Sequence, residues 1–221
     1  MADANKKRPA EVFTGLFFAL VDKLDRKLKR NLGEGVYLID STLIKLNELS
    51  PWARFSTDLL GVKAHIVYDA KAARPTFFSI MPARTNDITA AWDMVPRLDR
   101  GIDPGATYVF DLGYYHYRYW AALDEAGCRF VARLTSNTPL RIIRERKVPK
   151  GTNVLSDRIG FLPERHAGNR HNPMDQAVRE VRVLLDTGKE IRVVTNYLDA
   201  PASEIAALYK SRWTIELFSV G

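Results

Sequence analysis

The chain has 221 residues and a 46% hydrophobic content, enough for one large domain with its own core, and its single cysteine, Cys128, excludes an internal disulfide. The net charge of +7 favours a polyanionic partner, and the spread of Lys and Arg along the whole sequence favours a broad contact surface. No apolar run is long enough for a membrane span and no secretory signal is recognisable, so we expect a cytoplasmic protein.

The first part of the sequence predicts an α/β architecture. Residues 11–30 carry apolar side chains at four-residue steps, which is the pattern of an amphipathic helix. Runs of β-branched and aromatic residues then predict strands, with two stretches of helical spacing between them. This succession favours a mixed sheet with flanking helices. The predicted strands are 36–40, 64–68, 76–81, 107–111 and 129–133, and the predicted helices are 87–98 and 117–126.

From residue 138 the sequence becomes richer in turns and short β-prone pieces. Residues 140–144 and 178–185 are β-prone, and residues 190–195 follow the second piece after the turn Asp-Thr-Gly-Lys. This arrangement predicts a hairpin in which Gly188 adopts a positive φ. We interpret residues 138–197 as a β-rich insertion into the α/β core.

Two predicted strands end in an acidic residue. Asp40 follows Val-Tyr-Leu-Ile and precedes Ser41, and Asp111 follows Thr-Tyr-Val-Phe. We expect each aspartate to close its strand, and ligands of open α/β sheets gather at the carboxyl ends of strands. The alternative is that each aspartate simply caps a turn.

The final helix, opened by Pro201, carries a third acid. Tyr209, Arg212 and Glu216 are three and four residues apart, so they share one helical face. Three carboxylates at one place would repel one another unless a cation lies among them, and hard oxygen ligands favour Mg²⁺ or Mn²⁺. A pair of such ions suits in-line displacement at phosphorus. The alternative is that Glu216 is an exposed helix acid paired with Arg212.

Three motifs resemble the signatures of one family, the DDE transposases of the insertion sequence four type. The resemblance covers most of the chain and implies a ribonuclease H-like catalytic domain with a β-rich insertion before the last acid. It also implies metal-dependent cleavage of transposon ends and strand transfer during DNA transposition. The motifs are Tyr-Leu-Ile-Asp40-Ser-Thr, Val-Phe-Asp111-Leu-Gly-Tyr-Tyr and Tyr209-x-x-Arg212-Trp-x-Ile-Glu216-Leu-Phe.

The resemblance assigns roles to five residues. Asp40, Asp111 and Glu216 are expected to form the catalytic triad that binds Mg²⁺ or Mn²⁺. Tyr209 and Arg212 are expected to contact the backbone of double-stranded DNA near the cleaved end. The expected partners are the terminal inverted repeats of the transposon, the target DNA and a second copy of the chain in a homodimer.

The resemblance also suggests how the chain is divided. Residues 1–35 would be an N-terminal helical remnant, 36–137 the first part of the ribonuclease H-like core, 138–197 the insertion, and 198–221 a truncated C-terminal catalytic helix. The family's signature continues to a lysine that would fall at position 223, whereas this sequence ends at Gly221. We therefore expect a truncated transposase. The alternatives are a non-catalytic DNA-binding remnant and a ribonuclease H-like nuclease that cuts without joining ends.

Overall fold

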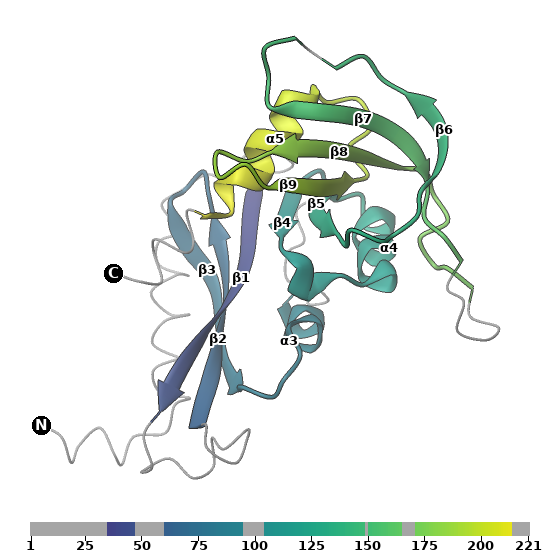
Figure 1. The fold of residues 1–221 in the computed structure, drawn as a ribbon. Helices are drawn as coiled ribbons and strands as arrows, with labels where there is room; N and C mark the ends of the chain where they lie inside the picture. Colours follow the sequence, from purple (N-terminus) through teal and green to yellow (C-terminus); the bar gives the residue numbers. More distant parts are fainter. Residues whose placement is uncertain (1–34, 47–59, 95–103, 149, 165–170, 214–221) are drawn as a thin grey trace, which may run out of the picture.

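The computed structural model describes residues 35–46, 60–94, 104–148, 150–164 and 171–213. These residues form one nine-stranded sheet with associated helices (Figure 1). None of the helices within these ranges has the length and apolarity required to cross a membrane. The strands are β1 Val36–Leu46, β2 Leu60–Asp69, β3 Arg74–Pro82, β4 Thr107–Phe110, β5 Arg129–Leu134, β6 Arg141–Glu145, β7 Val154–Phe161, β8 Val178–Leu184 and β9 Glu190–Thr195. The helices are α3 Asp87–Met94, the short 3-10 helix η2 Leu112–Tyr114, α4 Tyr117–Glu125 and α5 Ala202–Ser211.

The sheet has a mixed part and an antiparallel part. Its strand order is β3-β2-β1-β4-β5-β9-β8-β7-β6. β4 runs parallel to both β1 and β5, whereas every other neighbouring pair is antiparallel. Strands β6 to β9, which come from the predicted β-rich segment 138–197, continue the same sheet because β9 pairs with β5. The predicted mixed α/β sheet with flanking helices is confirmed.

Each face of the sheet has its own apolar core. On one face Ile39 and Phe110 pack with residues of α3, η2 and α4. On the other face Leu38 and Val109 pack with residues of α5. Because alternate residues of a strand share a face, Asp40 lies on the α5 face together with Leu38.

The prediction that Asp40 closes its strand is wrong. β1 continues beyond it to Leu46 and pairs with β2 over this whole extension. The polar residues Ser41 and Thr42 suggested a turn, but both take part in the pairing with β2. Cross-strand pairing with a long neighbour outweighs their weak local preference, so Asp40 lies inside an 11-residue strand.

The sequence did not predict β7. Asp157 and Arg158 interrupt its apolar pattern, and glycine at position 160 is unfavourable in a strand. Asp157 is nevertheless buried, because it pairs with Arg179 of β8. Gly160 is required because a Cβ atom there would lie 2.5 Å from the backbone carbonyl oxygen of Arg141 in β6. A buried charge and a glycine at a close contact with the paired strand β6 therefore hide β7 from pattern analysis.

Most other predicted elements are confirmed, with boundaries that shift by a few residues. Helix α4 ends before Gly127, which has a φ of 70°, and Pro201 is the N-cap residue of α5. The predicted β8–β9 hairpin has Gly188 at a φ of 79° in its turn. The predicted helix 11–30 and residues 95–98 of the predicted helix 87–98 lie outside the described residues.

A buried ion pair fixes the segment that leads into α5. The Nε and Nη2 atoms of Arg179 donate to the two carboxylate oxygens of Asp157 at 2.8 and 2.7 Å. The Nη1 atom of Arg179 donates to the carbonyl oxygens of Leu198 and Ala200, which lie between β9 and α5. Arg146 also contacts both Asp157 and the Leu198 carbonyl. These contacts hold the start of α5 against β7 and β8.

Strand β6 forms one edge of the sheet, and its five residues are all exposed. Ile142 and Ile143 are 43% and 55% exposed. They lie among the charged residues Arg141, Arg144 and Glu145, and the pairing with β7 shifts its register between Ile142 and Arg144. β6 is therefore a short, charged and irregular edge strand.

Removal of one partner of the buried ion pair should destabilise the fold strongly. We expect Arg179→Met to lower the free energy of unfolding by about 3–5 kcal/mol, because Asp157 would stay buried without its main partner. As a control, Lys210→Met removes the exposed ion pair with Asp186 and should cost less than about 1 kcal/mol. Urea unfolding followed by circular dichroism measures both changes. A loss for Arg179→Met as small as that of the control would contradict this account.

Candidate active site

Asp40 and Asp111 each directly follow a paired residue of two neighbouring parallel strands, β1 and β4. The register of β1 and β4 pairs Ile39 with Phe110, so the next residues along the two strands, Asp40 and Asp111, lie at the same level. Neighbouring strands are about 4.8 Å apart, which brings the two carboxylates into one neighbourhood. Asp111 follows the carboxyl end of β4, whereas Asp40 lies within β1. The structure thus brings together two of the three predicted acids.

The carboxylate of Asp111 is oriented by its own loop. Its Oδ1 atom accepts a hydrogen bond from the backbone N–H of Gly113 at 2.9 Å, and Asp111 is the N-cap residue of η2. This is the turn-capping role that the sequence left open as an alternative. Capping engages one carboxylate oxygen, and the side chain stays partly exposed, so this role is compatible with binding a ligand.

Helix α5 leads to the residues that lie over Asp40. The Nη1 atom of Arg212 is 3.4 Å from Oδ2 of Asp40, and the two side chains are only 10% and 12% exposed. Tyr209 is also buried, and its carbonyl oxygen accepts a hydrogen bond from the Arg212 backbone N–H at 3.2 Å. The guanidinium therefore balances the charge of Asp40. Glu216, the third predicted acid, lies outside the described residues, and so does its alternative pairing with Arg212.

Two tyrosines of this region are held in the protonated form. Burial raises the pKa of Tyr209, although the nearby charge of Arg212 opposes the rise. Burial also raises the pKa of Tyr114 well above its ordinary value, and the negative charges of Asp87 and Asp40 raise it further. Both phenols therefore remain neutral at neutral pH.

Sequence reasoning missed another acid close to the site. Asp87 was predicted only as the start or the cap of a helix, and it is the first residue of α3. Its Oδ1 atom accepts hydrogen bonds from Oγ of Ser41 at 3.0 Å and from Nζ of Lys63 at 2.9 Å. The three residues come from three separate elements, so no spacing in the sequence links them. Asp87 comes near the site through the fold, by its hydrogen bond with Ser41, the residue that follows Asp40 in β1.

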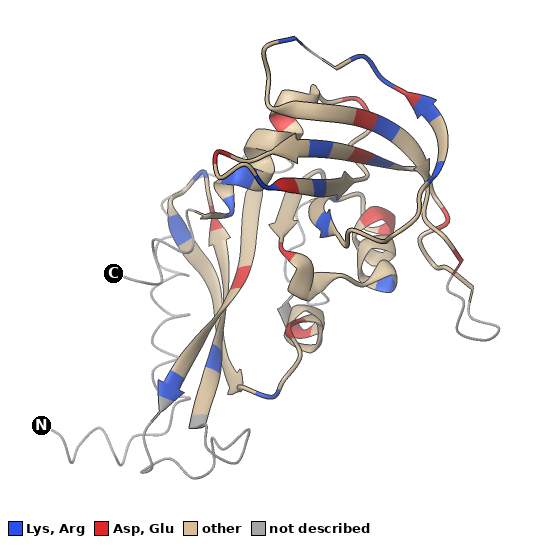
Figure 2. Cartoon of the chain, viewed as in Figure 1, with Lys and Arg blue, Asp and Glu red and all other residues tan. Residues whose placement is uncertain are grey.

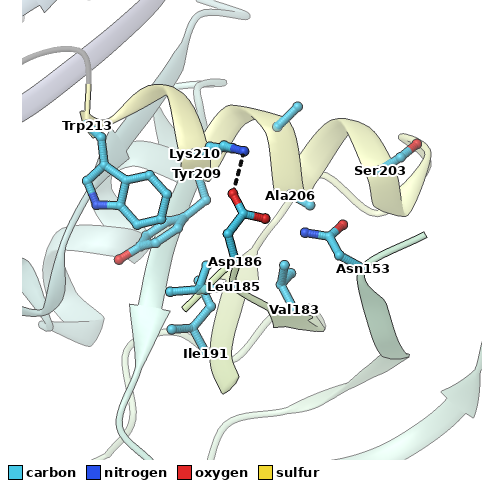
Figure 3. Close-up of a pocket in the computed structure, with 11 residues that line it drawn as sticks. Asn153, Val183, Leu185, Asp186, Ile191, Ser203, Ala206, Tyr209, Lys210 and Trp213 are labelled. Atoms are coloured by element: carbon cyan, nitrogen blue, oxygen red, sulfur yellow. Dashed lines mark hydrogen bonds and ion pairs between the residues drawn. The ribbon is translucent and has the colours of Figure 1, made fainter. Parts of the chain in front are cut away.

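A cavity of about 340 Å³ lies between α5 and the β8–β9 hairpin. Figure 3 shows Tyr209 and Trp213 at one end of the cavity and Asn153 toward the other end. Among the lining residues, Nζ of Lys210 donates to Oδ2 of Asp186 at 3.2 Å. The cavity therefore combines an aromatic wall with polar groups. Tyr209 borders this cavity and also precedes Arg212, the residue that contacts Asp40.

Basic and acidic residues alternate along the outer strands of the sheet (Figure 2). Glu180 accepts hydrogen bonds from Arg182 at 3.0 Å and from Arg192. Arg158 is 3.3 Å from Glu145. These pairs neutralise much of the positive charge on β7 to β9, so the broad basic surface expected from composition is weakened there.

The donor groups at the site suit a divalent cation. The carboxylate oxygens of Asp40 and Asp111 are hard ligands, which Mg²⁺ and Mn²⁺ prefer. Within the part of the chain that the structure describes, no three His, Cys, Asp or Glu side chains are grouped closely enough to hold a metal ion. The remaining predicted ligand, Glu216, is outside that part. The two aspartates therefore fit a metal site by their chemistry and by their adjacency on β1 and β4.

The mixed sheet and its flanking helices form a ribonuclease H-like fold. A solved piggyBac transposase, in a synaptic complex with hairpin DNA, superimposes with a TM-score of 0.51 at 12% sequence identity, over 83% of this chain and 39% of that chain. This similarity confirms the predicted fold class. The sequence matches the transposase DDE domain family over residues 31–220, and the chain belongs to that family.

Curated relatives carry transposase names. The chain is 38% identical over 221 residues to the protein y4zB of Sinorhizobium fredii (strain NBRC 101917 / NGR234), whose name describes a transposase. It is 26% identical over 220 residues to a protein of Geobacillus stearothermophilus that is named as a transposase for insertion sequence element IS5377. The chain spans 59% and 55% of the lengths of these two relatives.

Alkaline pH should lower the stability of the fold through ionisation of the buried Tyr114. The folded-state pKa of Tyr114 lies above its unfolded value of about 10, so the stability that it contributes is complete below that pH and is lost as the pH rises through the folded pKa. Phenylalanine cannot ionise, so Tyr114→Phe should lose less stability than the wild type between about pH 9 and pH 11. Urea unfolding at each pH measures the difference. Equal losses in the two proteins would show that Tyr114 does not carry the effect.

Proposed function

We propose that this chain carries the catalytic domain of a DNA transposase, which cuts double-stranded DNA at transposon ends and joins these ends to target DNA. The observation that carries the proposal is the placement of Asp40 and Asp111 at one level of adjacent parallel strands, in a member of the transposase DDE domain family. Phosphoryl transfer on DNA uses paired acids of this kind to hold metal ions at the reacting phosphorus. Assembly of two copies on a pair of ends belongs to the proposal. The solved piggyBac transposase, which is in a synaptic complex with hairpin DNA, supports DNA binding by analogy.

In this proposal Asp40, Asp111 and Glu216 hold Mg²⁺ or Mn²⁺. Such ions supply Lewis-acid stabilisation of the attacking and leaving oxygens. The donor chemistry and adjacency of the two aspartates support their part in the site. The part of Glu216 is supported by its spacing in the sequence, which would give it the same face as Arg212 and Tyr209 on a continuous helix. The loop of Asp111 orients its carboxylate in advance, which reduces the reorganisation needed when a metal ion binds.

Arg212 and Tyr209 are proposed to act at the DNA backbone near the cleaved end. Arg212 now balances the charge of Asp40, and a metal ion on Asp40 would take over that role. The guanidinium would then be available for a phosphate, which it binds through parallel hydrogen bonds. Tyr209, buried three residues before it and hydrogen-bonded to its backbone N–H, would limit the positions that Arg212 can adopt.

A cleavage assay tests the proposed chemistry. The full chain is incubated with DNA that carries the terminal repeats of its element, in Mg²⁺ or Mn²⁺. We expect cleavage by the wild type and a loss of more than about a hundredfold in Asp40→Asn and Asp111→Asn, because each removes a carboxylate that would bind the metal. Asp175→Asn removes an exposed acid and should keep full activity. Cleavage that persists in Asp111→Asn would contradict the proposal.

DNA affinity separates the proposal from its alternatives. Binding to the same DNA should weaken with salt, with a log–log slope of about −0.9 for each phosphate contacted. Arg212→Met should make this slope less steep, by about 0.9 for each phosphate contact that Arg212 makes. Titrations at several salt concentrations measure the change in slope. Binding without any cleavage would favour a non-catalytic remnant, and cleavage without end joining would favour a ribonuclease H-like nuclease.

A further inference from the structure

Asp87 contacts the strand that carries Asp40. Oγ of Ser41 and Nζ of Lys63 both donate to its Oδ1 atom, at 3.0 and 2.9 Å. Ser41 directly follows Asp40 in β1, and consecutive residues of a strand point to opposite faces of the sheet. Asp40 therefore faces α5 while Ser41 faces α3, and a force on Ser41 is transmitted to Asp40 through one peptide unit.

Asp87 also packs against the loop that carries Asp111. A Cβ atom built on Gly113 would lie 2.6 Å from Oδ2 of Asp87 and 3.2 Å from Oδ1 of Asp111. The backbone N–H of Gly113 is the group that orients the Asp111 carboxylate. The second oxygen of Asp87 thus fills the space beside this N–H, and only a residue without a side chain fits between the two carboxylates. Asp87 therefore contacts Ser41, which is bonded to Asp40 in the chain, and the Gly113 loop, which orients Asp111.

The surroundings of Asp87 are poorly solvated. His65 and Tyr114 are both 0% exposed, and their ring nitrogens and hydroxyl have no hydrogen-bond partner in the described part of the chain. The charge of Asp87 acts on both groups. Burial lowers the pKa of His65 and Asp87 opposes this change, whereas for Tyr114 burial and Asp87 both raise the pKa. Electrostatic effects are stronger in such an environment than in water, so the charge and position of Asp87 matter at the nearby loop.

We propose that Asp87 is a positioning residue for the metal site, holding Asp40 through Ser41 and Asp111 through the Gly113 loop. This inference rests on the proposed function, because it concerns the same two aspartates. The competing explanation is that Asp87 only stabilises the start of α3, as an acid in the first turn of a helix commonly does. The two explanations differ in what happens to metal affinity when the fold is intact.

Binding of Mn²⁺ to the full chain, measured by isothermal titration calorimetry, tests the proposal without requiring DNA cleavage. We expect Asp87→Asn to weaken Mn²⁺ binding by about 10–100-fold, the usual effect of removing a group that orients metal ligands. Asp93→Asn, which removes an exposed acid from the same helix, is the matched control and should leave the affinity unchanged. Urea unfolding of each variant gives the folded fraction by which the affinities are corrected.

A double-variant experiment tests the contact with the Asp111 loop. Gly113→Ala should weaken Mn²⁺ binding in the wild type, because the new methyl group would collide with the Asp87 carboxylate. In an Asp87→Ala background, the same change should cost much less, because the colliding oxygen is gone. This lack of additivity is the signature of two residues that act through one contact. Additive losses would overturn the proposed contact.

The remaining outcomes are distinguishable. If the wild type binds no Mn²⁺, or if Asp40→Asn and Asp111→Asn leave binding unchanged, the proposed function fails and the positioning role fails with it. If those two variants abolish binding while Asp87→Asn behaves like Asp93→Asn, only the positioning role is overturned. A loss in Asp87→Asn that disappears after correction for the folded fraction would likewise assign Asp87 to helix stability alone.

Discussion

The arrangement of the candidate site depends on the buried contact between Asp157 and Arg179. An arginine has five N–H donors, so Arg179 binds a carboxylate and the carbonyl groups before α5 at the same time. An apolar pair of similar volume could match its contribution to stability. It could not bind those carbonyl groups, and therefore could not define where α5 starts. Since α5 leads directly to Arg212, this contact anchors the start of the helix from which that guanidinium reaches Asp40.

Two consecutive residues of strand β1 make contacts on opposite faces of the sheet. Asp40 meets Arg212 on the α5 face, and Ser41 meets Asp87 on the α3 face. The parallel register with β4 then adds Asp111 at the same level. A change on either face thus reaches the aspartates through the backbone of a long, well-paired strand, which resists deformation better than a loop would.

The sequence predicts elements well where local pattern and environment agree. The β8–β9 hairpin follows from two β-prone runs around Gly188, and the end of α4 follows from Gly127. Prediction failed where a distant partner decides the outcome. The continuation of β1 depends on its pairing with β2, and the charge of Asp157 in β7 is acceptable only because Arg179 of the neighbouring strand forms an ion pair with it. The pairing of the aspartates depends on strand register, and the involvement of Asp87 depends on contacts between separate elements, which periodicity cannot reveal.

The character of β6 has a consequence for how the protein behaves at high concentration. An open sheet with adjacent isoleucines at its margin could recruit strands from other molecules and grow into polymers. At this margin the like-charged arginines and the irregular pairing with β7 oppose such growth. Mutual repulsion between arginines is screened by salt. The colloidal stability of the protein therefore depends partly on ionic strength, through five residues that are separate from the paired aspartates.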